Sequence, residues 1–547
     1  MLLTALPSGR PNVLLICVDD LKPNLGCYGD KRAVSPHIDA LANGGVRFEA
    51  AYCNQAVCSP SRNALLTGMR PQSLGIYDLA TNFRKAAPNA VTLPQLFKQS
   101  GYRTEALGKV FHVGHGNHED AASWSVPHFQ AKTVGYALPE NRASQTREGA
   151  LFENMDPKDK PKGAAYEKAD VADDAYGDGI IAMEAVARLK TAAAKPDQPF
   201  FLAVGFLKPH LPFCAPKKYW DMHDPAKFTL ATVRTPPSGA PDWAPQFGGE
   251  LRNYKDMPAK GAISDETQRT LIHGYYAATS YMDAQLGKVI AALRANGLAD
   301  NTIIVLWGDH GWHLGDHGMW CKHTNYEQAT RIPLVVVAPG IAKAGTGART
   351  LVETVDIYPT LCDLAKIAPP KGLDGISFAS TLVDPQAKGR DSVIHVYPRG
   401  PRLGRAIRTE THRLVEWKTV GAPASQAVYE LYDYKNDPQE TRNVAETDKE
   451  TVNRLKGILA KHPEAKPQFQ SKPGNTDRIT LFERKDANKD GKLSKAEFLA
   501  NQPDPDKAPA RFLDFDTNND GVLSREEFIL MGRSEEHTSE LQSRFGI

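Results

Sequence analysis

Short, unbroken apolar runs alternate with helical patterns along most of the chain. The runs are NVLLICV (12–18), RTEAL (103–107), PFFLAVGF (199–206), TIIVLW (302–307) and LVVVA (334–338). Runs of this length without polar alternation are typical of parallel strands that are buried on both faces. The pattern therefore predicts an α/β fold, with a mostly parallel central sheet flanked by helices.

Two of the intervening segments have clear helix signals. SPHIDALANGG offers Ser35 as N-cap, Pro36 at the first helical position and Gly44 as a stop. The segment 269–297 carries its apolar residues on one stripe and ends at Gly297. Both helices are expected to cover the sheet.

The pattern of apolar and polar positions changes from about residue 388. Four alternating segments, DSVIHVYP, GRAIRTE, HRLVEWK and AVYELYDY, predict a small antiparallel sheet, and a helix near 448–461 follows. A polar, proline-bearing linker comes next. The last stretch, RSEEHTSELQSR, resembles a translated sequencing adapter and is left out of fold reasoning. The predicted parts are an α/β catalytic domain (10–387), the antiparallel subdomain (388–462), the linker (463–476), a paired helix-loop-helix module (477–532) and an artefactual tail (533–547).

Composition narrows the class of protein. The chain has 547 residues, is 41% hydrophobic and 24% charged, and has a formal net charge of +2. These values are those of a soluble globular protein, and no basic run with interleaved aromatics argues for nucleic acid. No apolar run approaches the ~20 residues that a membrane span needs. The seven cysteines are scattered singly, which is not a disulfide framework. The start, MLLTALPSGRPN, is compatible with the end of a signal peptide.

Polar side chains follow four of the predicted strands directly. Functional residues of open α/β sheets gather at the carboxyl ends of strands. One such cluster alone would equally well be a helix cap, but four that converge predict a site. The side chains are those of Asp19 and Asp20, Lys109 and His112, Lys208 and His210, and Asp309 and His310. Three aspartates and a histidine suit a hard divalent cation, calcium or magnesium, better than zinc.

The stretch CSPSR (58–62), followed by Thr67 and Gly68, carries the strongest signal. A lone cysteine in an apolar stretch is usually a small buried hydrophobe. This motif, however, resembles the C-x-P-S-R signature of the sulfatase family of the alkaline-phosphatase superfamily. The segments VDD, GKVFH, KPHLPF and DHGWHLGDHGMWCKH fit the same family in order, over roughly residues 10 to 460. The similarity is to the iduronate-2-sulfatase-like branch, in which histidine follows the third metal-binding aspartate.

The resemblance implies a residue-by-residue mechanism. Cys58 would be converted to formylglycine by a maturation enzyme, and one hydroxyl of its hydrate would attack sulfur. Asp19, Asp20, Asp309 and His310 would bind the metal together with residue 58. Arg62 and Lys109 would stabilise the formylglycine and the developing charge. The remaining roles are proton transfers, with His210 and Lys322 protonating the leaving alcohol and His112 deprotonating the second hydroxyl.

The implied substrate is a sulfated saccharide, such as one with a 2-O-sulfated uronate at a chain end. A uronate carboxylate would need one more cation at the rim of the pocket, and Lys208 or His313 could supply it. Two alternatives stay open. One is a phosphonate monoester or phosphodiester hydrolase of the same superfamily, and the other is a non-catalytic calcium-binding protein in which Cys58 is never matured.

Two loops near the C-terminus have the EF-hand pattern, DANKDGKLSKAE and DTNNDGVLSREE. Calcium would bind at Asp486, Asn488, Asp490, the Lys492 carbonyl, Ser494 and Glu497, and at Asp516, Asn518, Asp520, the Val522 carbonyl, Ser524 and Glu527. A turn-rich acidic loop without metal is the alternative. Phenylalanines 482, 498, 512, 515 and 528 would pack the paired helices, and stiffening is favoured over calcium sensing. Such modules suit a periplasmic or extracellular setting.

Overall fold

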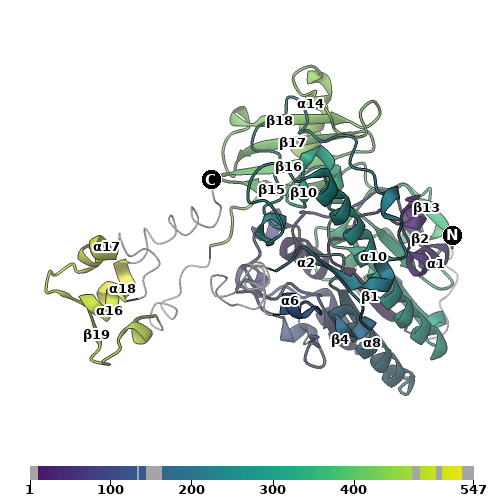
Figure 1. The fold of residues 1–547 in the computed structure, drawn as a ribbon, viewed down its shortest axis with the longest axis horizontal. Helices are drawn as coiled ribbons and strands as arrows, with labels where there is room; N and C mark the ends of the chain where they lie inside the picture. Colours follow the sequence, from purple (N-terminus) through teal and green to yellow (C-terminus); the bar gives the residue numbers. More distant parts are fainter. Residues whose placement is uncertain (1–9, 132–134, 143–162, 471–480, 501–507, 532–547) are drawn as a thin grey trace. The chain divides into compact units, whose positions relative to one another are not determined.

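The computed structural model describes residues 10–131, 135–142, 163–470, 481–500 and 508–531 (Figure 1). The N-terminal segment and the tail discussed above lie wholly or mainly outside these residues. The chain divides into two compact units, Met1–Phe469 and Gln470–Ile547, and each is described by itself. None of the helices in the described ranges has the length and apolar composition that a membrane crossing requires.

A seven-stranded sheet forms the centre of the first unit. Its order is β13 (Thr346–Ala348), β2 (Val46–Phe48), β12 (Leu334–Val337), β8 (Thr302–Gly308), β1 (Asn12–Val18), β6 (Phe200–Phe206) and β4 (Arg103–Gly108). Strands β1, β6 and β8 are buried along their whole length, as their unbroken apolar sequences predict. These strands and β4 pair in parallel.

The prediction that the strand at 334–338 runs parallel to its neighbours is wrong. Strand β12 runs antiparallel to both β8 and β2, so the sheet is mixed. A parallel strand would require the chain to cross to the other end of the sheet after β8. The segment 309–333 instead stays at the carboxyl end of β8, and the chain re-enters the sheet from there.

Helices cover both faces of this sheet. On one face, α1 (Pro36–Asn43), α8 (Gly177–Ala193) and α10 (Asp265–Ala295) pack against Leu14 and Ile16 of β1. On the other, α2 (Cys58–Thr67), α5 (Leu93–Gln99) and α12 (Ile357–Ala365) pack against Val13 and Leu15. Alternate residues of one strand thus enter two cores. The two helices predicted from sequence signals are confirmed.

Shorter elements complete the layers. The strands are β3 (Ala51–Tyr52), β11 (Arg331–Ile332) and β14 (Val352–Glu353) in one sheet, β9 (His313–Leu314) with β10 (Trp320–Cys321), and β5 (Tyr166–Ala169) with β7 (Phe213–Pro216). The helices are α3 (Pro71–Leu74), α4 (Phe83–Ala86), α6 (Pro139–Arg142), α9 (Lys217–Trp220), α11 (Glu327–Thr330) and α13 (Ala379–Val383).

The predicted four-stranded antiparallel sheet is present. It consists of β15 (Val393–Arg399), β16 (Arg402–Arg408), β17 (His412–Thr419) and β18 (Val428–Asp433). Helix α14 (Lys449–Leu459) packs on it through Val452, Leu455 and Leu459. The first part of the predicted linker is ordered on this unit, because the Lys466 amide donates to the Gln72 carbonyl oxygen over 3.0 Å.

A buried ion-pair network ties this small sheet to α11. Arg413 is fully buried, and its Nη2 lies 2.7 Å from Glu327 Oε2, while its Nη1 pairs with Glu440. Arg408 Nε lies 3.1 Å from Glu327 Oε2. Although burial opposes ionisation, Arg408 and Arg413 hold the pKa of Glu327 at about 2. Each charge therefore depends on the others.

The second unit is built from two similar halves. Strands β19 (Lys492–Ser494) and β20 (Val522–Ser524) pair antiparallel. Helices α16 (Lys495–Leu499), α17 (Ala508–Phe515) and α18 (Arg525–Met531) surround them. The core contains Phe482, Phe498, Phe512, Phe515 and Phe528, which confirms their predicted packing.

Replacing Arg413 by methionine should destabilise the first unit by about 3–5 kcal/mol, because it leaves the buried Glu440 without its paired cation and leaves Glu327 with Arg408 alone. Urea denaturation measures the change. Arg454→Met, at an exposed position of α14, is the control and should stay within about 0.5 kcal/mol. A loss for Arg413→Met no larger than the control's would contradict the coupling.

Candidate active site

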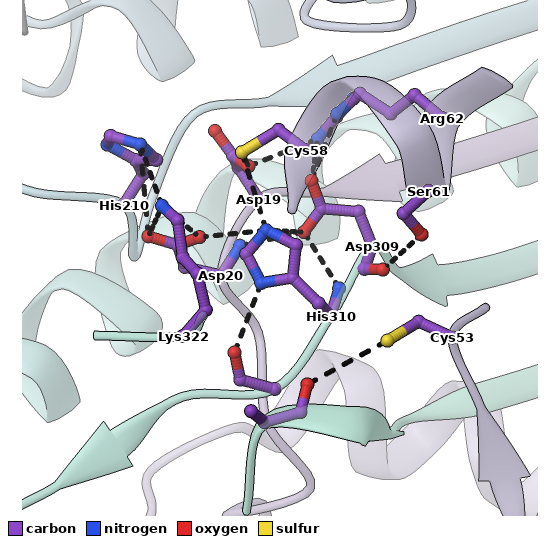
Figure 2. Close-up of polar contacts among 12 residues, drawn as sticks. Asp19, Asp20, Cys53, Cys58, Ser61, Arg62, His210, Asp309, His310 and Lys322 are labelled. Atoms are coloured by element: carbon purple, nitrogen blue, oxygen red, sulfur yellow. Dashed lines mark hydrogen bonds and ion pairs between the residues drawn. The ribbon is translucent and has the colours of Figure 1, made fainter. Parts of the chain in front are cut away.

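Four acidic and histidine side chains meet where two central strands end. Asp19 and Asp20 follow β1, and Asp309 and His310 follow β8. The strands are parallel neighbours, and their last residues, Val18 and Gly308, are partners in the register. Their carboxyl ends therefore coincide. The Asp20 amide donates to Asp309 Oδ1 over 3.0 Å, and His310 Nε2 lies 3.4 Å from Asp20 Oδ1 (Figure 2). The predicted convergence of these four side chains is confirmed.

The backbone at Asp20 is strained. Its φ of 57° lies in the left-handed region that a residue with a side chain rarely adopts. The hydroxyl of Tyr275 on α10 donates to the Asp20 carbonyl oxygen over 2.7 Å and helps to hold this conformation. Strain of this kind persists where the surroundings fix it, and it is commonly found at functional sites.

Cys58 is the first residue of α2, and its sulfur lies among the acidic side chains. The Sγ atom is 3.4 Å from Asp19 Oδ1 and 3.3 Å from His310 Nε2. The free amides at the start of α2 supply partial positive charge there. Burial and the negative charge of Asp19 raise the pKa of the Cys58 thiol well above its ordinary value. The encoded thiol is therefore protonated, whereas a cysteine nucleophile needs a lowered pKa.

Two cations neutralise the inner carboxylates. Arg62, one turn after Cys58, places Nη2 2.9 Å from Asp309 Oδ2 and 3.4 Å from Asp19 Oδ1. Lys109 follows β4, pairs with Asp19 and has Nζ 3.8 Å from the Cys58 sulfur. Although burial alone would raise it, these charges hold the pKa of Asp19 well below its usual range. Asp19 therefore stays ionised.

A second ionic group surrounds Asp20. Lys322 Nζ lies 3.1 Å from Asp20 Oδ1 and 2.9 Å from Glu250 Oε2 (Figure 2 shows Lys322 reaching Asp20). His210 Nε2 is 3.2 Å from Glu250 Oε1 and 3.4 Å from Lys322 Nζ. His210 Nδ1 lies 2.6 Å from the Leu211 carbonyl oxygen, to which it can only donate. Burial and Lys322 lower the pKa of His210 to about 4.

Sequence reasoning missed Glu250. It lies in an irregular segment between α9 and α10 and has no periodic pattern or motif around it. The backbone around Lys322, by contrast, shows strain on both sides, with φ of 70° at Cys321 and 55° at His323. These two residues turn the chain so that Lys322 reaches Asp20 from the β9–β10 hairpin.

His112 is buried, and its Nε2 is 3.0 Å from Nδ1 of His115. The two side chains expected as rim cations have other partners. Lys208 is not a rim cation, because its Nζ donates to the carbonyl oxygens of His210 and Pro212 over 2.9 and 2.6 Å. Nor is His313, which is fully buried against Thr324 and whose pKa is lowered to about 3 by burial.

The inner cluster fits a metal ion. Ligand atoms of Asp19, Cys58, Asp309 and His310 all lie within 4.8 Å of one another, and Asp20, Cys58 and His210 form a second such group. Burial, with repulsion from neighbouring carboxylates, raises the pKa of Asp20 and brings that of Asp309 to about 7. Packed carboxylates of this kind favour a bound cation, and their oxygen donors suit a hard one.

The two loops of the second unit are built alike. In the first, the Gly491 amide donates to Asp486 Oδ2 over 2.9 Å, and Glu497 Oε1 accepts from the Ala487 amide over 3.1 Å. In the second, the Gly521 amide donates to Asp516 Oδ2 over 2.9 Å, and Glu527 Oε1 accepts from the Thr517 amide over 3.1 Å. Each terminal glutamate therefore folds back toward the first aspartate of its loop.

Comparison with known proteins agrees with this geometry. The Sulfatase family model matches residues 11–367, the model "N-sulphoglucosamine sulphohydrolase, C-terminal" matches 315–464, and the EF hand model matches 479–500 and 510–531. Iduronate 2-sulfatase of Mus musculus is 34% identical over 514 residues, which cover 79% of this chain and 90% of that protein.

Solved structures share the fold. A protein in complex with its substrate D-glucosamine-2-N,6-O-disulfate matches with a TM-score of 0.66 and 22% identity, over 83% of this chain and 97% of the other. A phosphonate monoester hydrolase of Agrobacterium radiobacter matches with a TM-score of 0.65 and 25% identity, over 83% and 94%. The extent of the family model and of the 34% identical relative shows that this chain belongs to the sulfatase family.

Proposed function

We propose that this sulfuric ester hydrolase removes sulfate from a saccharide, with residue 58 as formylglycine and one divalent cation beside it. The observation that carries this proposal is the position of Cys58. Its sulfur lies between Asp19 and His310 at the start of α2, yet its thiol is held in the protonated form. The location of residue 58 suits a nucleophile, but a protonated thiol is a poor nucleophile. We therefore infer that the side chain is modified before it reacts.

The formal charge of the site supports a monoanionic ester. Four carboxylates face three cations, which leaves one negative charge, and a divalent cation makes the total one positive. A sulfate monoester carries one negative charge and would bring the site to neutrality, whereas a dianionic phosphate monoester would not. The groups counted are Asp19, Asp20, Asp309, Glu250, Arg62, Lys109 and Lys322.

The positions of the side chains around residue 58 support the following roles. Asp19, Asp20, Asp309 and His310 would hold calcium or magnesium together with residue 58, and the cation would draw charge from the sulfate oxygens. Arg62 and Lys109 hold Asp19 and Asp309 in place and face residue 58. Lys322, with His210 at 3.4 Å, would deliver the proton to the leaving alcohol. By the family resemblance alone, His112 would remove the proton from the second hydroxyl of the hydrated aldehyde.

A phosphonate monoester or phosphodiester hydrolase remains the second candidate, because its substrates carry the same single negative charge and a hydrolase of this class shares the fold. The alternative of a non-catalytic calcium-binding protein is disfavoured because the Sulfatase family model matches residues 11–367, which include the whole central sheet.

The substrate we propose is a 2-O-sulfated, uronate-containing oligosaccharide, preferred over a 6-O-sulfated hexosamine. Its support is the 34% identity to a protein named iduronate 2-sulfatase. The two EF-hand loops suit a calcium-rich setting, which supports a periplasmic or extracellular location. A formylglycine-generating enzyme would be the maturation partner.

Conversion of residue 58 should be visible in the tryptic peptide Phe48–Arg62. In active protein that was co-expressed with a maturation enzyme, residue 58 should react with a hydrazide probe, while Cys53 in the same peptide keeps its thiol and is alkylated. The rate of 4-nitrophenyl sulfate hydrolysis should rise with the converted fraction and exceed that of an aryl phosphonate. Full activity with an unmodified residue 58 would end the proposal, and faster phosphonate turnover would favour the second candidate.

The two histidines should fail at different stages. His210→Ala should slow release of the alcohol, most strongly for poor leaving groups. His112→Ala should release one equivalent of a phenol in a burst and then turn over slowly, at a rate independent of the leaving group. Stopped-flow absorbance with a series of aryl sulfates separates these cases. The same leaving-group dependence in both variants would refute the division of roles.

A further inference from the structure

The turn between β15 and β16 presents aromatic and cationic side chains beside the site. Arg399 and Arg402 are directly opposite each other across the two strands, and Tyr397 is two residues before Arg399, so the three share one face. Arg399 Nη2 donates to the His323 carbonyl oxygen, and the Tyr397 and His323 rings are 6.2 Å apart. His323 is the neighbour of Lys322, so this face adjoins the site.

Among the described residues, no carboxylate forms an ion pair with the arginines of this turn. Arg399 donates hydrogen bonds to several backbone carbonyl oxygens, including that of Trp243 at 2.8 Å, and it interacts with the Tyr397 side chain. The Arg402 guanidinium lies 4.3 Å from the centre of the Trp243 ring. Arg405, Arg408 and Arg413 of the same sheet each pair with glutamate.

Continuous contacts connect this turn to the catalytic residues. Gln246, three residues after Trp243, donates from Nε2 to the Lys322 carbonyl oxygen over 3.2 Å, and Glu250 of the same segment pairs with Lys322. Lys322 is buried, whereas Trp243 and Arg402 are half-buried. The contacts therefore lead from the buried site to partly exposed residues.

We propose that Arg402 and Trp243 form a subsite for an anionic group, a carboxylate or a second sulfate, on the saccharide that bears the scissile ester. Arg399 holds the surrounding segments by its carbonyl contacts, which leaves Arg402 to bind the ligand. A guanidinium matches both groups through paired hydrogen bonds, and its stacking on the Trp243 ring helps to hold the Arg402 guanidinium in position. This subsite rests on the proposed saccharide function and supplies the rim cation that Lys208 and His313 do not.

A binding measurement tests the subsite independently of the catalytic reaction. In a Cys58→Ala background, calorimetry would compare a 2-O-sulfated uronate disaccharide with its carboxyl-reduced form and with a form that carries an added 6-O-sulfate. Cys58→Ala alone should bind at least one of the two more anionic sugars about tenfold or more tightly than the carboxyl-reduced one, as expected for charge-assisted hydrogen bonds. Arg402→Gln should abolish that preference. Arg402→Lys, which keeps the charge, should retain part of it. Arg294→Gln, at an exposed position of α10, should retain all of it.

A preference set by the carboxylate identifies a uronate, and one set by the added sulfate identifies a disulfated sugar. No preference before Arg402 is changed, or an undiminished preference in Arg402→Gln, would overturn the subsite. Failure of the proposed function shows separately, as matured wild-type protein that releases no sulfate from any of these sugars.

Discussion

The site depends on three carboxylates that are buried together at the meeting ends of two parallel strands. Asp19, Asp20 and Asp309 repel one another and are far from water, so the structure must supply positive charge around them. It does so from separate elements, with Arg62 on α2, Lys109 after β4 and Lys322 after the β9–β10 hairpin. Cys58, the proposed nucleophile position, lies where these cations and the carboxylates meet, and a divalent cation would complete the balance of charge.

The segment 309–333 links this charge cluster to the rest of the fold. It begins with Asp309 and His310 and forms the β9–β10 hairpin next to Lys322. It then continues through α11, whose Glu327 pairs with Arg408 and Arg413 of the small antiparallel sheet. The same sheet reaches the hairpin through Arg399. The C-terminal sheet therefore contacts the segment that carries Lys322 at two places, and the irregular segment 243–250 contributes Glu250 to the same group of charges.

Sequence reasoning could predict what is local. Asp19, Asp309 and their neighbours were found because they directly follow buried apolar runs, and Cys58 because its motif lies within eleven residues. Long-range relations were not accessible. The direction of β12 depends on where the preceding segment stays, and the pairing of Glu250 with Lys322 joins residues 72 positions apart. Lys208 and His313 were misjudged because sequence does not show which carbonyl oxygens or core contacts a side chain meets.

Metal content tests the central account most directly. Calcium binding at the two EF-hand loops would be removed by the double substitution Glu497→Gln and Glu527→Gln. The purified full-length protein would be equilibrated with calcium and magnesium, separated from unbound metal by gel filtration, and analysed by inductively coupled plasma mass spectrometry. We expect one equivalent of divalent cation to remain per chain, and Asp309→Asn added to this background to remove it while the protein stays folded. A protein that retains no metal before Asp309 is changed, or the full equivalent afterwards, would contradict the account.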